Sequence, residues 1–473
     1  MNFDPVAYTA AALSAPILLA LTAFAILLLP LFFKGLRGTQ GLIGLGAVLV
    51  CLTFFRAAPQ ARLSLFYGAL EISPLSAYLW AFALAVLGLT IVLSLARPPA
   101  QEGNEGEFYF LVVMAAIGLM VMVSAGDLFT AFIALELLSL PVYALAGIRR
   151  TKPGLEAAYK YFMLGAFGSG VTILGIAILN ALYPSLAFEA LRSAPAAAPQ
   201  LALAGFLLVI AGFAFKTALV PFHMWVPDAY EGAPTQVSAF MAAAVKAGGV
   251  VLLWRLFSVF SGGPVVKVFW WLTVITAVFA NLAALAQNGL KRLLAYSSIA
   301  HAGYLAVAFF GGRPGFEAVL YYLPVYAMAT IGAFSVALAL EKDEKGPKIE
   351  DLAGLAKRRP WLAAAMAAFM FSLAGVPPLA GFFAKFYAFA AAVSGGYTSL
   401  VVIAVIMSAV SVYYYLRVTV VMYMKQPAEV AMTAPQAPGA VEAVVFLMAM
   451  GVLLAGVFSG PLLSLAANAS HWF

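Results

Sequence analysis

The sequence GFAFK at residues 212–216 is followed by Pro221, and GFFAK at residues 381–385 is preceded by Pro377 and Pro378. Both are Gly-Phe-x-x-Lys patterns beside a proline, within long apolar runs. Because proline has no backbone N–H, it breaks a helix and frees the carbonyl four residues earlier. Free carbonyls at membrane depth are tolerated only inside protein or beside a water-filled cavity. The two patterns therefore predict two broken membrane helices, each with local hydration near a lysine.

The composition is that of a membrane protein. Of the 473 residues, 64% are hydrophobic and 10% are charged, whereas soluble domains have about 25% charged residues. The net charge of +7 is explained by loop charges that orient membrane helices, so the expected partner is the lipid bilayer and not nucleic acid. The single cysteine, Cys51, excludes an internal disulfide and a cysteine-rich metal or iron–sulfur site.

Helices of about 20 apolar residues can cross a bilayer. The sequence predicts an all-α polytopic membrane protein with about 14 transmembrane helices. The segment 361–394 contains the two adjacent prolines and is expected to break there. The predicted spans are 12–33, 41–57, 75–96, 107–125, 127–148, 155–183, 199–220, 235–260, 266–287, 289–312, 315–341, 361–394, 397–426 and 440–467.

The two lysine patterns occupy equivalent places in two five-helix blocks, spans 4–8 and spans 9–13. A five-helix unit that is repeated once runs in opposite directions through the membrane, so the blocks predict two inverted repeats with helices 7 and 12 broken. Matching breaks in two halves are typical of a transport path. The expected division is an N-terminal three-helix segment (1–106), a first repeat (107–260), a second repeat (266–426) and a C-terminal helix (440–473).

The distribution of basic residues predicts the orientation. An even number of spans puts both termini on one side of the membrane. With both termini outside, about fifteen Lys and Arg fall in inner loops and about six in outer loops, as the positive-inside rule requires. The longest charged connection, 341–359, is then inside, and its mixed charges predict a solvated connector.

Four ionisable residues lie within apolar spans: Glu136, Lys216, Lys246 and Lys385. A charge at the bilayer centre costs at least about 2.5–3.5 kcal/mol, so all four are expected to face the protein interior. A structural interpretation pairs Glu136 with Lys216 and lets Lys246 or Lys385 extend to an interface. A functional interpretation is a proton relay, because a buried lysine, unlike arginine, can release its proton.

Two further residues leave alternatives open. His301 shares a helical face with a serine and a tyrosine. It could connect Lys246 to Lys385 as a relay member, or remain a neutral histidine that is hydrogen-bonded to those hydroxyls. Lys160 lies near a span end, where it could anchor the helix or extend the polar path. No nucleotide-binding loop and no His-rich metal signature is present in the sequence, so the energy must come from an ion gradient or a partner chain.

Several segments resemble the antiporter-like membrane subunits of bacterial respiratory complex I. They are ELLSLPVY at 136–143, YKYFMLGA at 159–166, PFHMWVPDAYEGAPT at 221–235, KRLLAYSSIAH at 291–301 and the GFFAK pattern. Within that family, YEGAP at 230–234, KYF at 160–162 and the lysine at position 385 resemble the N-type branch. The resemblance covers most of the chain.

The resemblance implies roles for the membrane charges. Glu136 and Lys216 would be the coupled pair, Lys246 the connecting residue and Lys385 the residue of the outer half-channel. It also implies a proton pump in the bacterial inner membrane, driven by NADH–quinone electron transfer elsewhere in the complex. This chain would hold no cofactor, and NADH, FMN, iron–sulfur clusters and quinone (ubiquinone) would bind partner subunits. Types K and M would be its neighbours, with A, H, J and L in the same membrane arm.

Two other classes of function remain. A subunit of a multi-subunit cation/proton antiporter of the sodium/proton type has the same fold, and only its partner chains would distinguish it. A scaffold that has lost transport would be expected to lack one of the four membrane charges, and all four are present.

Overall fold

The computed structural model describes residues 12–36, 38–54, 62–99, 104–193, 198–260, 262–341, 346–426 and 438–472. Within these residues, eleven helical stretches are long and apolar enough to cross a membrane, and three further apolar helices are shorter. Each of the fourteen predicted spans contains helix, so the all-α membrane fold is confirmed. The exact number of crossings stays a prediction. The orientation also stays a prediction, and residues 1–11 and Phe473 lie outside the described residues.

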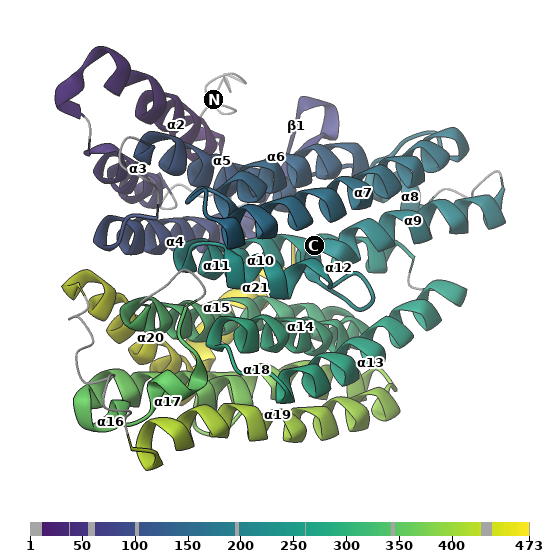
Figure 1. Ribbon diagram of the computed structural model, residues 1–473. Coiled ribbons are helices and arrows are strands. Elements are labelled where there is room, and N and C mark those ends of the chain that lie inside the picture. The colour runs from purple at the N-terminus through teal and green to yellow at the C-terminus, as the bar shows by residue number, and fades with distance from the viewer. Residues whose placement is uncertain are drawn as a thin grey trace.

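The described helices follow the chain in the order shown in Figure 1. The long ones are α2 (Ser14–Phe32), α3 (Gln40–Phe54), α4 (Pro74–Ala96), α5 (Glu105–Ser124), α6 (Leu128–Ala146), α7 (Lys152–Leu182), α9 (Pro199–Thr217), α12 (Lys246–Val259), α13 (Gly263–Leu285), α14 (Leu290–Ala308), α15 (Gly312–Leu340), α17 (Pro360–Ala374), α18 (Ala380–Ser394), α19 (Thr398–Met424), α20 (Gly439–Val457) and α21 (Ser459–Ser470). The short elements are β1 (Leu63–Leu65), β2 (Leu70–Ile72), α8 (Phe188–Ser193), α10 (Trp225–Gly232), α11 (Thr235–Phe240), the π-helical segment η4 (Met241–Val245) and α16 (Leu355–Arg358).

The two expected helix breaks are present. Helix α9 ends at Thr217, where Ala218 adopts a left-handed conformation with φ of 63°, and α10 begins only at Trp225. Helix α17 ends before Gly375, which has φ of +88°, and α18 begins five residues later. A left-handed residue is a common helix terminator, and the following prolines prevent the helix from continuing.

The two five-helix blocks pack with the same internal neighbours. In the first block α5 packs against α6, and in the second α13 packs against α14. Helix α7 packs along α9, as α15 packs along α17 and α18. Helix α12 contacts α5 and α9, and α19 likewise contacts α13 and α17. Figure 1 shows the blocks one above the other. That the two blocks are inverted repeats stays a prediction.

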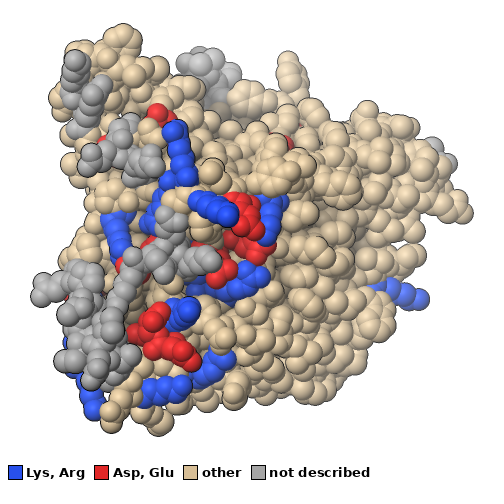
Figure 2. All heavy atoms as spheres, viewed as in Figure 1, with Lys and Arg blue, Asp and Glu red and all other residues tan. Residues whose placement is uncertain are grey.

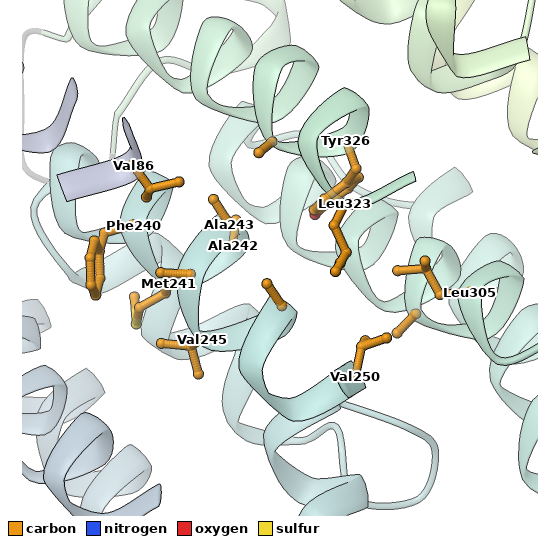
Figure 3. Close-up of a cluster of buried hydrophobic side chains, with 14 of the residues drawn as sticks. Val86, Phe240, Met241, Ala242, Ala243, Val245, Val250, Leu305, Leu323 and Tyr326 are labelled. Atoms are coloured by element: carbon orange, nitrogen blue, oxygen red, sulfur yellow. The ribbon is translucent and has the colours of Figure 1, made fainter. Parts of the chain in front are cut away.

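The core lies where the two blocks meet. In the continuous stretch Thr235–Val259, made of α11, η4 and α12, residues 235–257 are all buried within the protein. Figure 3 shows apolar side chains of η4 facing Val86 of α4, with Leu323 and Tyr326 of α15 nearby. The outer helices expose large apolar side chains instead, as expected for a surface in lipid. Charged side chains gather toward one side of the face in Figure 2.

Four features differ from the sequence expectation. The last predicted span, 440–467, is two helices, because Pro461 cannot donate to the carbonyl of Val457 and is tolerated only in the first turn of a new helix. The short helix α10 and the hairpin of β1 and β2 were not expected. Glu341, placed in a solvated connector, is 3% exposed. The four-part division of the chain stays a prediction.

Candidate functional site

Glu136 is a half-buried carboxylate in the middle of α6. The hydroxyl of Ser169, on α7, donates to Glu136 Oε1 at 2.5 Å. Tyr143 lies seven residues further along the same helix, and this spacing places both side chains on one helical face, two turns apart. The carboxylate therefore begins a polar face that continues along α6.

Lys216 reaches that face from the last turn of α9, directly before the break. Its side chain is 3% exposed, and Nζ donates to the hydroxyl of Tyr143 at 2.7 Å. Nζ also lies 4.6 Å from the ring centroid of Tyr143 and 5.3 Å from that of Tyr161. Among the ion pairs of the described residues none joins Glu136 to Lys216. Each has a hydroxyl partner of its own instead.

After the helix break, the first residue of α10 packs against the aromatic rings around Lys216. Trp225, the first residue of α10, stacks on the ring of Tyr161 at 4.1 Å. Its indole N–H donates to the carbonyl of Phe215 at 2.8 Å, one residue before Lys216. Three aromatic rings, of Tyr143, Tyr161 and Phe215, have centroids within 5.5 Å of the ammonium, which cation–π contacts can stabilise without a carboxylate.

A cluster of ion pairs joins α10 to α7 and α14. Asp228 accepts from Lys160 of α7 and from Arg292 of α14, both at 2.9 Å, and Arg292 also pairs with Glu231 at 2.9 Å. Burial alone would raise the pKa of Asp228, but its hydrogen bonds to Lys160 and Arg292 hold that pKa below the usual value. Lys160 therefore anchors α10 to α7.

Lys246 begins α12, directly after the π-helical segment η4. It is 2% exposed, and Nζ donates to both the hydroxyl and the carbonyl oxygen of Ser298 on α14. The Tyr326 ring centroid is 5.1 Å from Nζ. Gly249 lets α12 approach α9 closely, since a Cβ there would lie 2.9 Å from Thr217 Cγ2. Short π-helical segments occur frequently at functional sites.

His301, 3% exposed on α14, contacts tyrosines on two other helices. Its Nδ1 is 2.8 Å from the hydroxyl of Tyr322 on α15, and its Nε2 is 3.2 Å from that of Tyr415 on α19. The hydroxyl of Tyr415 also bonds to that of Ser297 at 2.5 Å. The hydroxyl partners of His301 are therefore tyrosines of neighbouring helices, not the serine and tyrosine on its own helical face.

Lys385 uses a carbonyl that the proline break frees. Its Nζ donates to the carbonyl of Ala374 at 2.9 Å, which is the carbonyl that Pro378 cannot bond, and to the hydroxyl of Ser408 at 2.9 Å. The side chain is 5% exposed. Nζ lies 4.9 Å from the ring centroid of Tyr304. The idea that Lys246 or Lys385 extends to an interface is therefore wrong, since both end in buried hydrogen bonds.

The five predicted site residues form two groups. The first group is Glu136, which lies on the same face of α6 as Tyr143, and Lys216, which donates to the Tyr143 hydroxyl. His301 lies between the other two lysines: the ring of Tyr326 faces both Lys246 and His301, and the ring of Tyr304 faces both His301 and Lys385. Among the hydrogen bonds of the described residues, no chain joins Lys216 to Lys246. Within the same residues no group of three His, Cys, Asp or Glu could hold a metal ion.

The sequence from residue 125 to residue 411 matches the NADH:quinone oxidoreductase/Mrp antiporter transmembrane family. The chain belongs to this family. The matched region contains all five site residues of this antiporter-family chain and both of its helix breaks. Family membership was expected from the motifs around Glu136, Lys216 and His301, and it is confirmed.

The similarity to named proteins extends over nearly the whole length. The NADH-quinone oxidoreductase subunit N of Chloroflexus aggregans is 39% identical over 472 residues, which cover 96% of each chain. A chain in respiratory complex I from Thermus thermophilus is 36% identical with a TM-score of 0.83, covering 96% of this chain and 99% of that one. A chain of the Mrp complex from Dietzia sp. is 21% identical with a TM-score of 0.79, covering 98% and 95%, and shows that the fold is shared.

Several polar contacts in this antiporter-family chain were not expected from sequence. They are made by Ser169, Tyr143, Ser298, Tyr322 and Ser408. Tyr143 could have been found by extending the face of Glu136 two turns along its helix. The serines could not be predicted from the sequence around them, because each bonds to a lysine or glutamate on a different helix.

Proposed function

We propose that this chain translocates protons across the membrane as the N-type subunit of an NADH–quinone oxidoreductase. One observation carries the proposal: three buried lysines end on hydroxyl, carbonyl and aromatic partners, and no described carboxylate forms an ion pair with them. A buried ammonium without a counter-ion is costly. The charged and neutral forms of each lysine can therefore lie close in free energy, which a proton relay needs.

The relay has two parts. Glu136 and Lys216 form the first part. Their protonation states are coupled along the face of α6, because gain of a proton by one group changes the proton affinity of the other. Lys246 connects this part to the second block, and Lys385 serves the outer half-channel. His301, placed between Lys246 and Lys385, passes the proton through its tyrosine contacts. Water beside the breaks at 218–224 and 375–379 would complete the path.

The energy comes from partner subunits. No redox cofactor is assigned to this chain, and NADH, FMN, the iron–sulfur clusters and quinone belong to other subunits of the complex. Subunits of types K and M are the proposed neighbours, and types A, H, J and L the other members of the membrane arm. The complex lies in a bacterial inner membrane, with both termini of this chain on the periplasmic side.

A cation/proton antiporter subunit is the second candidate. The Dietzia Mrp chain supports it, because the fold is the same. The identity is lower, however, at 21% against 39% and 36% for the complex I relatives. The first candidate is therefore favoured.

Affinity purification of the full chain from its own membranes distinguishes the two functions. The proposal expects NADH dehydrogenase subunits to co-purify, together with NADH–quinone reductase activity that acidifies the lumen of reconstituted vesicles. Purification with small antiporter subunits, and sodium/proton exchange without NADH oxidation, would replace it with the second candidate.

A further inference from the structure

Glu341 is a buried carboxylate at the end of α15 that the relay does not use. It is 3% exposed, and Oε1 accepts from Arg149, after α6, at 2.8 Å. Its other oxygen, Oε2, accepts from the hydroxyl of Thr235 at 2.9 Å. Thr235 is the first residue of α11, whose chain continues through η4 to Lys246. Glu341 thus links the ends of the helices that carry Glu136 and Lys246.

The C-terminal end of α4 also contacts the end of α15 near Glu341. Arg97 donates to the carbonyls of Leu338 at 2.5 Å and of Glu341 at 2.7 Å. Gln236, next to Thr235, donates to the carbonyl of Arg97 at 2.5 Å. The bonds to the carbonyls of Glu341 and Arg97 satisfy acceptors that the ends of α15 and α4 leave open. The carboxylate is also favoured at the positive N-terminus of α11.

Polar contacts near both ends of the helical stretch Thr235–Val259 fix its depth in the membrane. Residues 235–257 of this stretch are buried, so lipid headgroups cannot anchor them. The apolar contacts of the stretch are not directional, whereas hydrogen bonds fix the positions of particular atoms. Polar contacts hold both ends: Glu341 binds Thr235 at one end, and at the other Arg255 donates to the carbonyls of Val123 and Ala125. Lys246 lies between these two fixed points.

We infer that Glu341 and Thr235 are positioning residues for Lys246, holding its helix at the depth where the ammonium meets Ser298. This inference rests on the proposed proton relay. It gives Glu341 a function distinct from the relay residues, since its carboxylate touches no relay lysine. A misplacement of about 1 Å can reduce the rate of a proton or group transfer by about a hundredfold.

Proton pumping by the assembled complex in vesicles tests the inference. Thr235→Val removes the hydroxyl with little change in shape, and we expect it to lower pumping by roughly tenfold, the effect of losing one hydrogen bond to a charged group. Thr235→Ser retains the hydroxyl and should restore pumping. Thr273→Val is the matched control, because the buried hydroxyl of Thr273 bonds only to the carbonyl of Phe269 in its own helix. Complex content is measured for every variant.

Combined variants separate positioning from general damage. Ser298→Ala leaves Lys246 only the carbonyl acceptor, so adding Thr235→Val should lower pumping by less than about twofold, because both changes act through one contact. In a Ser408→Ala background, which affects Lys385, Thr235→Val should retain its full effect. If Thr235→Val lowered pumping by the same factor in the Ser298→Ala and Ser408→Ala backgrounds, the inference would be overturned. Wild-type pumping by Thr235→Val alone would also overturn it. If Lys246→Ala itself pumps normally, the proposed relay is wrong instead.

Discussion

Replacement of Tyr143 by phenylalanine isolates one contact of the relay. The variant removes the hydroxyl that accepts from Lys216 Nζ at 2.7 Å but keeps an aromatic ring 4.6 Å from the ammonium. A hydrogen bond to a charged group contributes about 1.5–3 kcal/mol. Because Lys216 is 3% exposed, water is not expected to replace the lost acceptor fully. The charged form of Lys216 becomes less stable by this amount, which is about a 10- to 100-fold change in an equilibrium.

The assay is NADH-driven acidification of vesicles that contain the whole complex, normalised to complex content and to quinone reduction. We expect Tyr143→Phe to lower pumping by at least about tenfold. Tyr321→Phe is the control, since it removes a hydroxyl that donates to the neutral carbonyl of Ala455 at 2.9 Å. If the Tyr143 variant pumped as well as the Tyr321 variant, the contact between Tyr143 and Lys216 would have no role in proton movement.

Three further predictions concern helix packing and charge. Gly249→Ala puts a Cβ 2.9 Å from Thr217 Cγ2 and 3.2 Å from the backbone nitrogen of Thr217. The variant should destabilise the chain by about 1–3 kcal/mol in thermal unfolding. Gly170→Ala is the control and should not destabilise it, because a Cβ there has open space around it. Arg292→Gln removes two partly exposed ion pairs. It should lower the free energy of unfolding by no more than about 1 kcal/mol for each pair, and by less when unfolding is measured in high salt. Glu136→Gln keeps a hydrogen-bond acceptor but removes the charge, and should change the pH profile of NADH–quinone activity; an unchanged profile would leave Glu136 only a structural role.

The helix breaks could be predicted because proline acts locally. The missing N–H of Pro378 frees the carbonyl of Ala374 whatever the surrounding fold, and Lys385 occupies that carbonyl. The burial of Lys216, Lys246 and Lys385 was predicted for a similarly local reason, the cost of a charge in lipid. Both conclusions need only the residue type and the apolar run around it.

The partners of these residues could not be predicted, because they depend on which helices touch. Nothing near Lys246 in the chain indicates Ser298, which lies on α14. Glu341 was misjudged for the same reason: it begins a charged connection, but the ends of three other helices surround it. The break after Val457 was a different failure, since the proline at position 461 is a local signal that hydropathy alone does not register.

The number of protons pumped per NADH oxidised, measured for Lys216→Ala and Lys385→Ala in the assembled complex, tests the relay most directly. Lys267→Ala is the control, because Lys267 is exposed on α13. The relay predicts that this ratio or the coupled electron-transfer rate falls in both buried-lysine variants and stays at the wild-type value in the control. Wild-type pumping by both buried-lysine variants would contradict it.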